Sequence, residues 1–489
     1  MMDMENKYSM EKKSTFIWHA LPVVGLLVWG ALCITDNLWY DEAYSASMVS
    51  QSWMRLFYTS VVDDHSPFYY SILKIFYHLC GGGTQFWKMK LLSLLFMEGY
   101  LLLGKYYVKK LFGQQISVWF MLFSILMPIM GVQAGNVRMY AAALFFTTFM
   151  GLTAYDIYLD ATRRKWRVFC VLSICTVYCH TFTMIQAFFF YLIFLAVLLY
   201  RKQFDKIKAF FICGGTVALV FSPWLAVTCR QMIQRMQYDT GSTAELATIY
   251  SFMDYCKEWF SALETPIGPV MFLGMGVCLV LGYLAVDWMR AEHNYAPAAG
   301  MGALGLTVLA GGLVSAFMNN CFLGRYVFSG FGFLMLFYAA GMSRLKRKCW
   351  RAGILAVAAC CFLAQYREEI LLEYDDGLET YEAFWQEQVG EKDEIIASGP
   401  HTVFLSVYHP EHQYYIYPYK LYSLPFANTD SLYDRNRLNG EGALWYIAFA
   451  GDTPQFARED YDYEEALAFH YMYYDFVIYR LTPSTTRTD

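Results

Sequence analysis

The sequence has few charged residues. Asp, Glu, Lys and Arg make up 16% of its 489 residues, whereas an ordinary globular chain has roughly 25%. Hydrophobic residues make up 57%, the mean hydropathy is +0.30 and the net charge is only -5, which excludes an intrinsically disordered chain. Several apolar runs reach the length of about 18 residues that spans a bilayer. The composition therefore argues against a soluble enzyme and predicts a helical polytopic membrane protein.

Motifs for metals, disulfides and nucleotides are missing. The 13 cysteines form no CxxC pair and no Cys/His spacing typical of zinc ligands, so we expect them to be small buried hydrophobic residues. No GxGxxG follows a predicted strand, and GxxxxGK[ST] does not occur. Internal repeats are not evident. The sequence thus indicates no certain cofactor, no metal site and no nucleic-acid partner, and it leaves a requirement for a divalent cation open.

Charge is divided unevenly along the chain. Residues 1–365 carry 29 Lys or Arg and 19 Asp or Glu, a net charge of +10, whereas residues 366–489 carry 8 and 23, a net charge of -15. The second part also has no cysteine and no long apolar run. We therefore predict two domains, a transmembrane catalytic domain over 1–365 and a soluble extracytoplasmic domain over 366–489.

The pattern within residues 366–489 is mixed and predicts a small α/β domain. Expected helices lie near 375–390 and 459–472. Expected strands lie within 395–406, 443–450 and 475–481.

Basic clusters alternate with acidic or neutral loops, and short basic loops stay in the cytoplasm. This alternation predicts about eleven crossings, with the N-terminus inside and the C-terminal domain outside. Apolar segment 67–80 is only about 14 residues long and opens with Pro67, so it is predicted to be an interfacial or re-entrant helix. The expected localisation is a cell membrane, with a bacterial plasma membrane as the simplest case. The expected crossings lie near 16–34, 87–104, 116–134, 139–158, 168–200 (two crossings), 209–228, 266–286, 298–318, 326–343 and 350–365.

The first outer loop is rich in acids. A helix over 41–58 would place Val49, Trp53 and Leu56 on one stripe, so we expect it to lie on the membrane surface. Asp41 and Glu42 then occupy its first turn. Acids there can cap the helix and complement its dipole, or one of them can act as a general base at the membrane boundary. The sequence leaves both interpretations open.

Two isolated arginines fall on the expected outer side, against the usual bias. They are Arg138, in GNVRMY with Tyr140, and Arg325, followed by Tyr326 in GRYVF. An arginine beside a membrane often reaches toward lipid headgroups, but its planar fork also fits phosphate oxygens. His180, at the expected outer turn of 168–200, is either a structural residue or part of this site. Carboxylates, cations and aromatic rings on one face suit transfer of a group from a lipid phosphate.

The order of these motifs resembles membrane glycosyltransferases of the GT-C superfold. Asp-Glu after the first span, an acidic stretch entering HSPFYYSILK, then RMY, then RY at a late span is most similar to family 39. That family includes dolichyl-phosphate-mannose protein mannosyltransferases and the bacterial lipid A aminoarabinose transferase. The resemblance covers roughly residues 16–345. It implies a GT-C transmembrane domain with interfacial helices in the first outer loop.

The resemblance also implies a polyprenyl-phosphate sugar donor and an inverting transfer on the outer face. Two departures stand out: Ser66 replaces the first proline of the family's His-Pro-Pro segment, and Gly135–Val137 holds no acid before Arg138. A second catalytic acid, and a metal site built on it, are therefore in doubt. The implied catalytic carboxylates are Asp41, as the base, and Glu42. The other implied roles are Arg138, Tyr140, Arg325 and Tyr326 at the donor phosphate, and Asp64, His65, Tyr69 and His180 in the acceptor or sugar pocket.

Two other classes of protein stay open. A secondary transporter would place ionisable groups near the bilayer midplane and usually shows paired repeats. A non-catalytic membrane scaffold would only present the acidic outer domain. For the glycosyltransferase, the bilayer and the lipid-linked donor are the expected partners, and the acceptor is a lipid, a polysaccharide or a protein.

Overall fold

The structure is a computed structural model. It describes residues 2–63, 65–238, 268–317, 323–417, 426, 429–432, 438, 440–452, 454, 456 and 461–484. The chain divides into two compact units, each described by itself below. The helical unit comprises residues 1–33, 64–69 and 90–368. The mixed unit comprises residues 34–63, 70–89 and 369–489.

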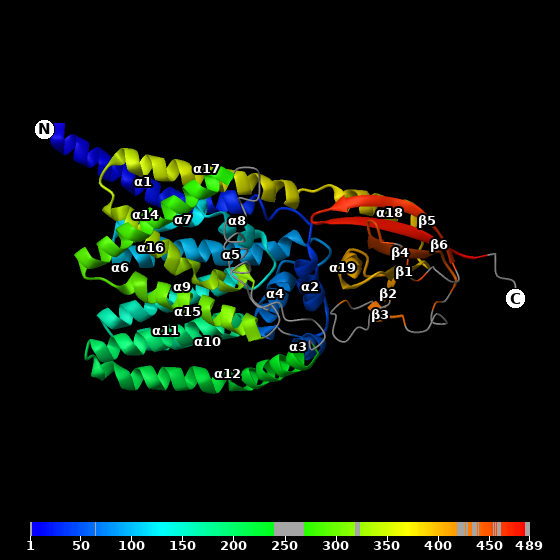
Figure 1. Cartoon of the computed structure of the whole chain (residues 1–489), viewed down its shortest axis with the longest axis horizontal. Coiled ribbons are helices and arrows are strands. Elements are labelled where there is room, and N and C mark those ends of the chain that lie inside the picture. The colour runs from blue at the N-terminus through cyan, green and yellow to red at the C-terminus, as the bar shows by residue number, and fades with distance from the viewer. Residues whose placement is uncertain are drawn as a thin grey trace. The chain divides into compact units, whose positions relative to one another are not determined.

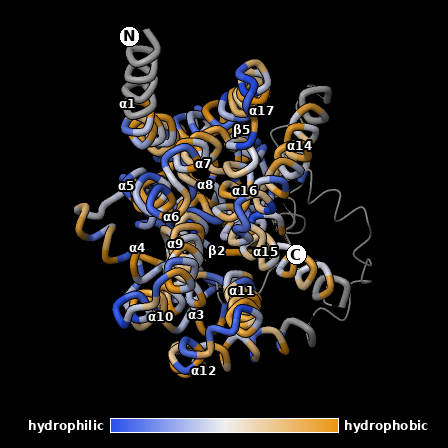
Figure 2. The backbone as a smooth tube through the Cα atoms, turned by 90° about the vertical axis from the view of Figure 1, so that its left-hand side faces the viewer, coloured by the Kyte–Doolittle hydropathy of each residue, from blue (hydrophilic) through white to orange (hydrophobic). Residues whose placement is uncertain are grey.

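The helical unit is a bundle of long, mostly apolar helices that run alongside one another (Figure 1). Viewed along their axes, the helices stand side by side, with hydrophobic residues over much of their length (Figure 2). The helices that lie wholly or mostly in this unit are α1 (Met2–Gly30), α5 (Trp87–Leu102), η1 (Leu103–Val108), α6 (Lys109–Phe112), α7 (Gln114–Leu126), α8 (Pro128–Gly135), α9 (Tyr140–Leu159), α10 (Arg163–Cys179), α11 (Thr181–Tyr200), α12 (Phe204–Tyr238), α14 (Gly268–Glu292), α15 (Ala296–Phe317), η3 (Gly324–Gly330), α16 (Phe331–Arg344) and α17 (Lys348–Glu373).

The helical unit confirms the predicted polytopic membrane fold. Within the described residues, eight helices are long and apolar enough to cross a bilayer, and a ninth crossing results if α7 and α8, bent by 69°, form one span. This is fewer than the expected eleven. The other two expected crossings correspond to the apolar part of α1, Phe16–Gly30, and to α10, which has 17 residues. Both are shorter than the roughly 20 residues of an ordinary span, so their crossing stays a prediction.

The outward-facing side chains of this unit suit contact with lipid. Leu219 on α12 is 74% exposed and Leu279 on α14 is 75% exposed. Large apolar surfaces of this kind are unfavourable in water but are the normal surface of a membrane protein. By contrast, Phe169, Phe190 and Phe194 of α10 and α11 are buried in an aromatic core.

Glycine allows the start of α16 to pack closely against two neighbouring helices. A side-chain carbon at Gly332 would collide with the hydroxyl group of Thr148 on α9. One at Gly330 would collide with the amide group of Gln186 on α11, which also bonds to the hydroxyl group of Ser329. Because Ser329 and Gly330 are the last residues of η3, these contacts hold the C-terminal end of the short helix that contains Arg325 and Tyr326.

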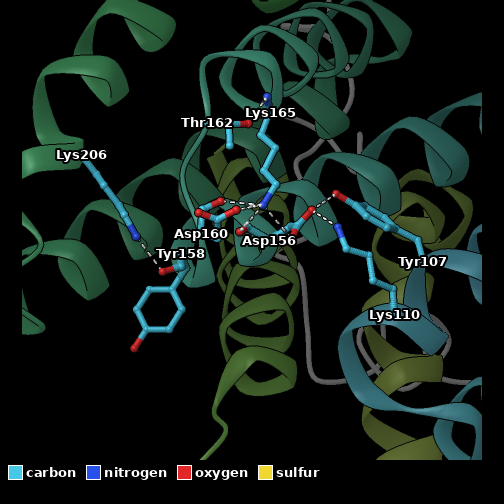
Figure 3. A network of polar contacts seen from close by, with 8 residues as sticks. All are labelled: Tyr107, Lys110, Asp156, Tyr158, Asp160, Thr162, Lys165 and Lys206. Carbon is cyan, nitrogen blue, oxygen red and sulfur yellow. Dashed lines mark hydrogen bonds and ion pairs between the residues drawn. The ribbon is translucent and has the colours of Figure 1, made fainter.

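A polar network joins several helices near the C-terminal end of α9 (Figure 3). The Asp156 carboxylate, 6% exposed, accepts a hydrogen bond from the Tyr107 hydroxyl at 2.8 Å and one from Lys110 at 2.6 Å. Lys165 of α10 forms an ion pair with Asp156 at 3.2 Å, and Lys206 of α12 donates to the Tyr158 carbonyl at 2.7 Å. A buried carboxylate requires such partners, and here they tie η1, α6, α10 and α12 to α9.

The mixed unit contains a six-stranded sheet of order β3-β2-β1-β4-β6-β5. Strands β3, β2, β1 and β4 run parallel to one another. Strand β6 pairs antiparallel with both β4 and β5. Its elements, with the helices of the first outer loop, are α2 (Tyr40–Ser50), α3 (Trp53–Val62), α4 (Pro67–Leu79), α18 (Gly377–Gln388), β1 (Glu394–Ala397), α19 (Pro400–Val403), η4 (Phe404–Val407), β2 (Gln413–Ile416), β3 (Thr429–Ser431), β4 (Leu444–Phe449), β5 (Tyr461–Tyr471) and β6 (Tyr474–Pro483).

The predicted α/β character of the C-terminal domain is confirmed, with one wrong element. Helix α18 and strands β4 and β6 lie where expected, and strand β1 occupies only the first residues of 395–406. The helix expected over 459–472 is instead strand β5. The run YEEALAF favours a helix by local propensity, but ten residue pairs with β6 and a turn with Met472 at φ 53° form a hairpin. Sheet pairing thus overrides local propensity here.

The single surface helix expected over 41–58 is also wrong. Two helices, α2 and α3, are separated at Gln51 and Ser52, where the backbone is extended. The Ser52 side chain caps α3 by accepting a hydrogen bond from the Arg55 amide at 3.3 Å. The expected stripe divides accordingly: Val49 and Leu56 are fully buried, whereas Trp53 is 43% exposed. Segment 67–80 does form a helix, α4, of 13 residues.

Candidate functional site

Arg138 lies in the tight turn between α8 and α9. Pro128 starts α8 after an extended Met127, and the helix ends at Gly135. The Asn136 carbonyl then accepts two hydrogen bonds, from the Ser93 hydroxyl at 2.6 Å and from the Arg138 amide at 2.8 Å. The turn is therefore well defined, and it leaves the Arg138 side chain 3% exposed. A guanidinium at such a depth needs partners within the protein or a bound anion.

One partner of Arg138 is His65. The guanidinium Nη2 lies 2.7 Å from the His65 Nε2 atom. An arginine can only donate, so Nε2 must accept and carries no proton in this arrangement. This hydrogen bond joins the turn before α9 to the residues just ahead of α4. His65 directly precedes α4, whose first residue is Pro67, and the Ser66 hydroxyl accepts the Phe68 amide at 3.3 Å.

His180 contributes a second neutral imidazole. Its Nδ1 atom accepts the Phe182 amide at 3.2 Å and so caps α11. Burial lowers the pKa of His180 well below its ordinary value, and the guanidinium charges of Arg138 and Arg325 lower it further. His180 therefore has an unprotonated Nδ1 atom and an Nε2–H group available as a donor.

Tyr326 lies against both residues of this cap. Its ring centroid is 4.7 Å from that of His180 and 5.3 Å from that of Phe182, with the Phe182 ring nearly parallel to it. Tyr140, the first residue of α9, lies 6.1 Å from His180. These contacts bring η3, α9 and α11 together. Phe182 was missed by the sequence analysis, although it stands two residues after His180 in the same YCHTF motif.

Five of the predicted site residues therefore gather within the helical unit: His65, Arg138, Tyr140, His180 and Tyr326, with Arg325 close enough to act on His180 electrostatically. The group thus combines two guanidinium groups, two imidazoles and two phenol rings. Because arginine forks match phosphate oxygens and neutral imidazoles add donors without competing charge, the chemistry suits a phosphate group. Tyr69 of α4 is buried in the same unit, 1% exposed. Asp64 lies outside the described residues.

The predicted acids Asp41 and Glu42 lie in the mixed unit, on the first turn of α2. Glu42 is 1% exposed, and its Oε2 atom accepts the Trp39 amide at 3.3 Å. This is the capping role that the sequence left open for the pair. Asp41 is partly exposed, and its carbonyl accepts the Ser45 hydroxyl at 3.0 Å. The side chain of Asp41 is therefore the better placed of the two to react.

The segment before α2 is bound firmly to the C-terminal domain within the mixed unit. The Leu38 amide donates to the Tyr471 hydroxyl at 2.8 Å and to the Tyr408 hydroxyl at 3.0 Å. The Asn37 side chain donates to the Asp375 carbonyl at 2.8 Å. The domain of residues 369–489 thus helps to position the acidic turn. Across the described residues, no group of three or more His, Cys, Asp or Glu side chains could hold a metal ion.

The lowered pKa of His180 can be tested by the pH dependence of the protein's stability. Near pH 6.5 the unfolded chain starts to protonate this histidine while the folded protein does not, so the free energy of unfolding falls as the pH decreases below about 7. His180→Asn keeps an acceptor for the Phe182 amide but cannot titrate. We expect its midpoint of thermal unfolding to fall less than that of the wild type between pH 7 and pH 5.

His470 serves as the control for this experiment. A hydrogen bond to Asp475 raises its pKa, so its contribution to stability is full below pH 6.5 and is lost as the pH rises. His470→Asn should therefore make the acid-induced decline slightly steeper. Identical declines for the wild type and His180→Asn would contradict the assignment of His180 as a neutral, buried imidazole.

Comparison with solved structures supports this fold. The chain is similar to ArnT from Cupriavidus metallidurans in the apo state, with a TM-score of 0.61 at 12% sequence identity over 95% of this chain and 97% of that chain. ArnT from the same organism bound to undecaprenyl phosphate gives a TM-score of 0.60 at 12% identity, over 94% and 98%. An Archaeoglobus fulgidus oligosaccharyltransferase gives only 0.47 at 11% identity, over 81% and 62%. No family model and no curated protein matches the chain.

At 12% identity the likeness to ArnT establishes the fold. The chain is a multi-pass membrane protein with a fold like that of ArnT, which agrees with the fold class that the order of its motifs predicted. Both domains are included, because the match extends over nearly the whole of each chain.

Proposed function

We propose that this protein is an integral membrane glycosyltransferase that uses a polyprenyl-phosphate sugar as its donor. The observation that supports this function best is the cluster of Arg138, His65, His180, Arg325 and Tyr326 in a chain with the ArnT fold. That ArnT has been solved with undecaprenyl phosphate supports a lipid phosphate as the ligand of this site. A transporter fits less well, since the cluster lies at helix ends.

The donor phosphate is the leaving group of the proposed reaction. When the bond between the sugar carbon and the phosphate oxygen breaks, negative charge builds up on the phosphate. The guanidinium groups of Arg138 and Arg325 stabilise that charge, and stabilisation that increases toward the transition state accelerates the reaction. Neutral His65 orients Arg138 through its hydrogen bond, and the Nε2–H group of His180 is a further donor.

Asp41 is the proposed general base. It takes the proton from an acceptor hydroxyl group as the hydroxyl oxygen attacks the sugar carbon from the side opposite the phosphate, and a single displacement inverts the configuration. The carboxylate group of Glu42 is already engaged with the Trp39 amide, so its proposed role is to shape the helix start. His65 and Tyr69, with Asp64, are proposed to line the sugar or acceptor pocket.

The proposed orientation follows the basic clusters. The Arg138 end of the bundle and the C-terminal domain face the outside of a cell membrane, and the ends with the lysine-rich turns face the cytoplasm. The acceptor is proposed to be a lipid, a polysaccharide or a protein that reaches the site from the outer side of the membrane.

The direct test is an assay of purified full-length protein in detergent with a panel of polyprenyl-phosphate sugars. We expect one donor to release polyprenyl phosphate, by hydrolysis or by transfer to an added acceptor, detected by mass spectrometry. The Arg138→Ala protein is the negative control. If no donor of the panel is turned over and none binds, the proposed activity is wrong and a transporter or scaffold becomes the better hypothesis.

A further inference from the structure

A cavity of about 330 Å³ lies at the opposite end of the bundle from Arg138. It is formed by the C-terminal ends of α9 and α11 and by the turn between α14 and α15. Helix α11 has 20 residues, from its cap at His180 to Tyr200 beside this cavity. At 1.5 Å per residue the two sites are roughly 30 Å apart, which is about the thickness of the hydrocarbon core. The cavity therefore belongs to the other leaflet from the phosphate site.

The cavity is amphipathic. Its inner wall is apolar and includes Phe190, Ile193 and Phe194. Its mouth holds Arg201, His293, Asn294 and the rings of four tyrosines. The tyrosines are Tyr155, Tyr158, Tyr200 and Tyr295. Tyrosine rings are typical of the boundary between headgroups and acyl chains. The cavity therefore offers polar side chains at the depth of a lipid headgroup and apolar side chains at the depth of the acyl chains.

The two turns at the mouth hold unusual backbone conformations. Among the described residues, the non-glycine residues with positive φ are Lys202 at 56°, His293 at 50° and Met472 at 53°. Met472 belongs to a hairpin turn, but the other two flank this cavity. Both residues directly follow a helix, where the amides of Gln203 and Asn294 bond back to the carbonyls of Leu198 and Met289. These helix ends place Arg201 and His293 at the cavity.

We propose that this cavity binds an anionic glycerophospholipid of the cytoplasmic leaflet, with the phosphodiester at Arg201 and His293 and the start of an acyl chain against Phe190 and Phe194. The charge count favours this ligand over the lipid-phosphate donor. Among the lining residues that the structure describes, Arg201 is the one permanent cation, which matches the single charge of a phosphodiester. A phosphomonoester carries a charge of about -1.5 to -2, which the two arginines of the other site match better. Basic pockets between transmembrane helices commonly bind such headgroups.

The inference is tested by lipid binding, without reference to catalysis. Purified full-length protein is delipidated and titrated with phosphatidylglycerol, phosphatidylcholine or a polyprenyl phosphate, and bound lipid is counted by native mass spectrometry. We expect phosphatidylglycerol to bind about tenfold more tightly than phosphatidylcholine, because the ammonium group of phosphatidylcholine offsets the phosphodiester charge that faces Arg201. Arg201→Gln should remove this preference, and Ala299→Phe, which fills the cavity, should weaken binding of both phospholipids.

Lys208→Gln is the matched control, because Lys208 is an exposed cation of the same end of the bundle but does not line the cavity. It should bind phosphatidylglycerol as the wild type does. Equal effects of Arg201→Gln and Lys208→Gln would overturn the proposal in favour of diffuse attraction to the basic surface. Tighter binding of polyprenyl phosphate that is lost in Ala299→Phe would also overturn it, by assigning the cavity to the donor lipid. An unchanged unfolding midpoint verifies that each variant is folded.

Discussion

Asp41→Asn is expected to lower the rate of sugar transfer by a factor of about 10² to 10⁴, the usual contribution of a general base. Asparagine has nearly the same size and can still accept a hydrogen bond, so the fold of α2 should persist. It cannot take up the proton of the attacking hydroxyl group. The effect should appear in kcat, measured with purified protein and a productive polyprenyl-phosphate sugar, while binding of polyprenyl phosphate itself stays unchanged.

Glu42→Gln is the matched control for Asp41→Asn. The neighbouring side chain is buried and accepts the Trp39 amide, and a glutamine oxygen can accept the same hydrogen bond. We therefore expect Glu42→Gln to reduce the rate by less than tenfold. If Glu42→Gln is inactive while Asp41→Asn remains active, the base has been assigned to the wrong acid. If neither variant loses activity, the proposed mechanism through α2 fails.

The second large effect is expected for Arg138. Arg138→Ala should lower kcat/KM for the donor by a factor of about 10² to 10³, a loss typical for removal of one group that stabilises developing negative charge. The variant also leaves His65 without the guanidinium that it orients. Binding of polyprenyl phosphate alone should weaken in parallel, which separates this role from that of Asp41. Both quantities are measured on the same detergent-purified protein.

Arg138→Lys distinguishes geometry from charge. Lysine keeps the positive charge but offers a point donor instead of a planar fork, so it cannot bond to His65 and to two phosphate oxygens in the same way. We expect an intermediate loss of about tenfold. Arg290→Ala, at the last turn of α14, removes an exposed arginine and should have no effect. Wild-type kcat/KM in Arg138→Ala, or equal losses for both positions, would refute a direct role at the phosphate.

Hydropathy and charge predicted the membrane fold because both are local properties of the sequence. Apolar runs locate the helices that cross the membrane, and basic turns assign the direction of each crossing. The same reasoning singled out Arg138 and Arg325, since isolated arginines on the outer side need a reason. It did not predict the hydrogen bond between Arg138 and His65, which are 73 positions apart, because such pairs depend on how helices pack. The break between α2 and α3 was missed because one cap at Ser52 outweighs a continuous apolar stripe.

Helix α9 is pinned at both ends, near Arg138 by the Asn136 turn and near its last residue by the contacts of Asp156. Sliding it by one helical turn, about 5.4 Å, would break both sets of contacts. Helix α9 is therefore expected to keep its position while the proposed lipid donor binds and leaves. The C-terminal end of η3 is held as well, by the contacts of Ser329 and Gly330 with Gln186 on α11. For the proposed lipid donor, Arg138 and Arg325 are thus expected to be in place before it binds.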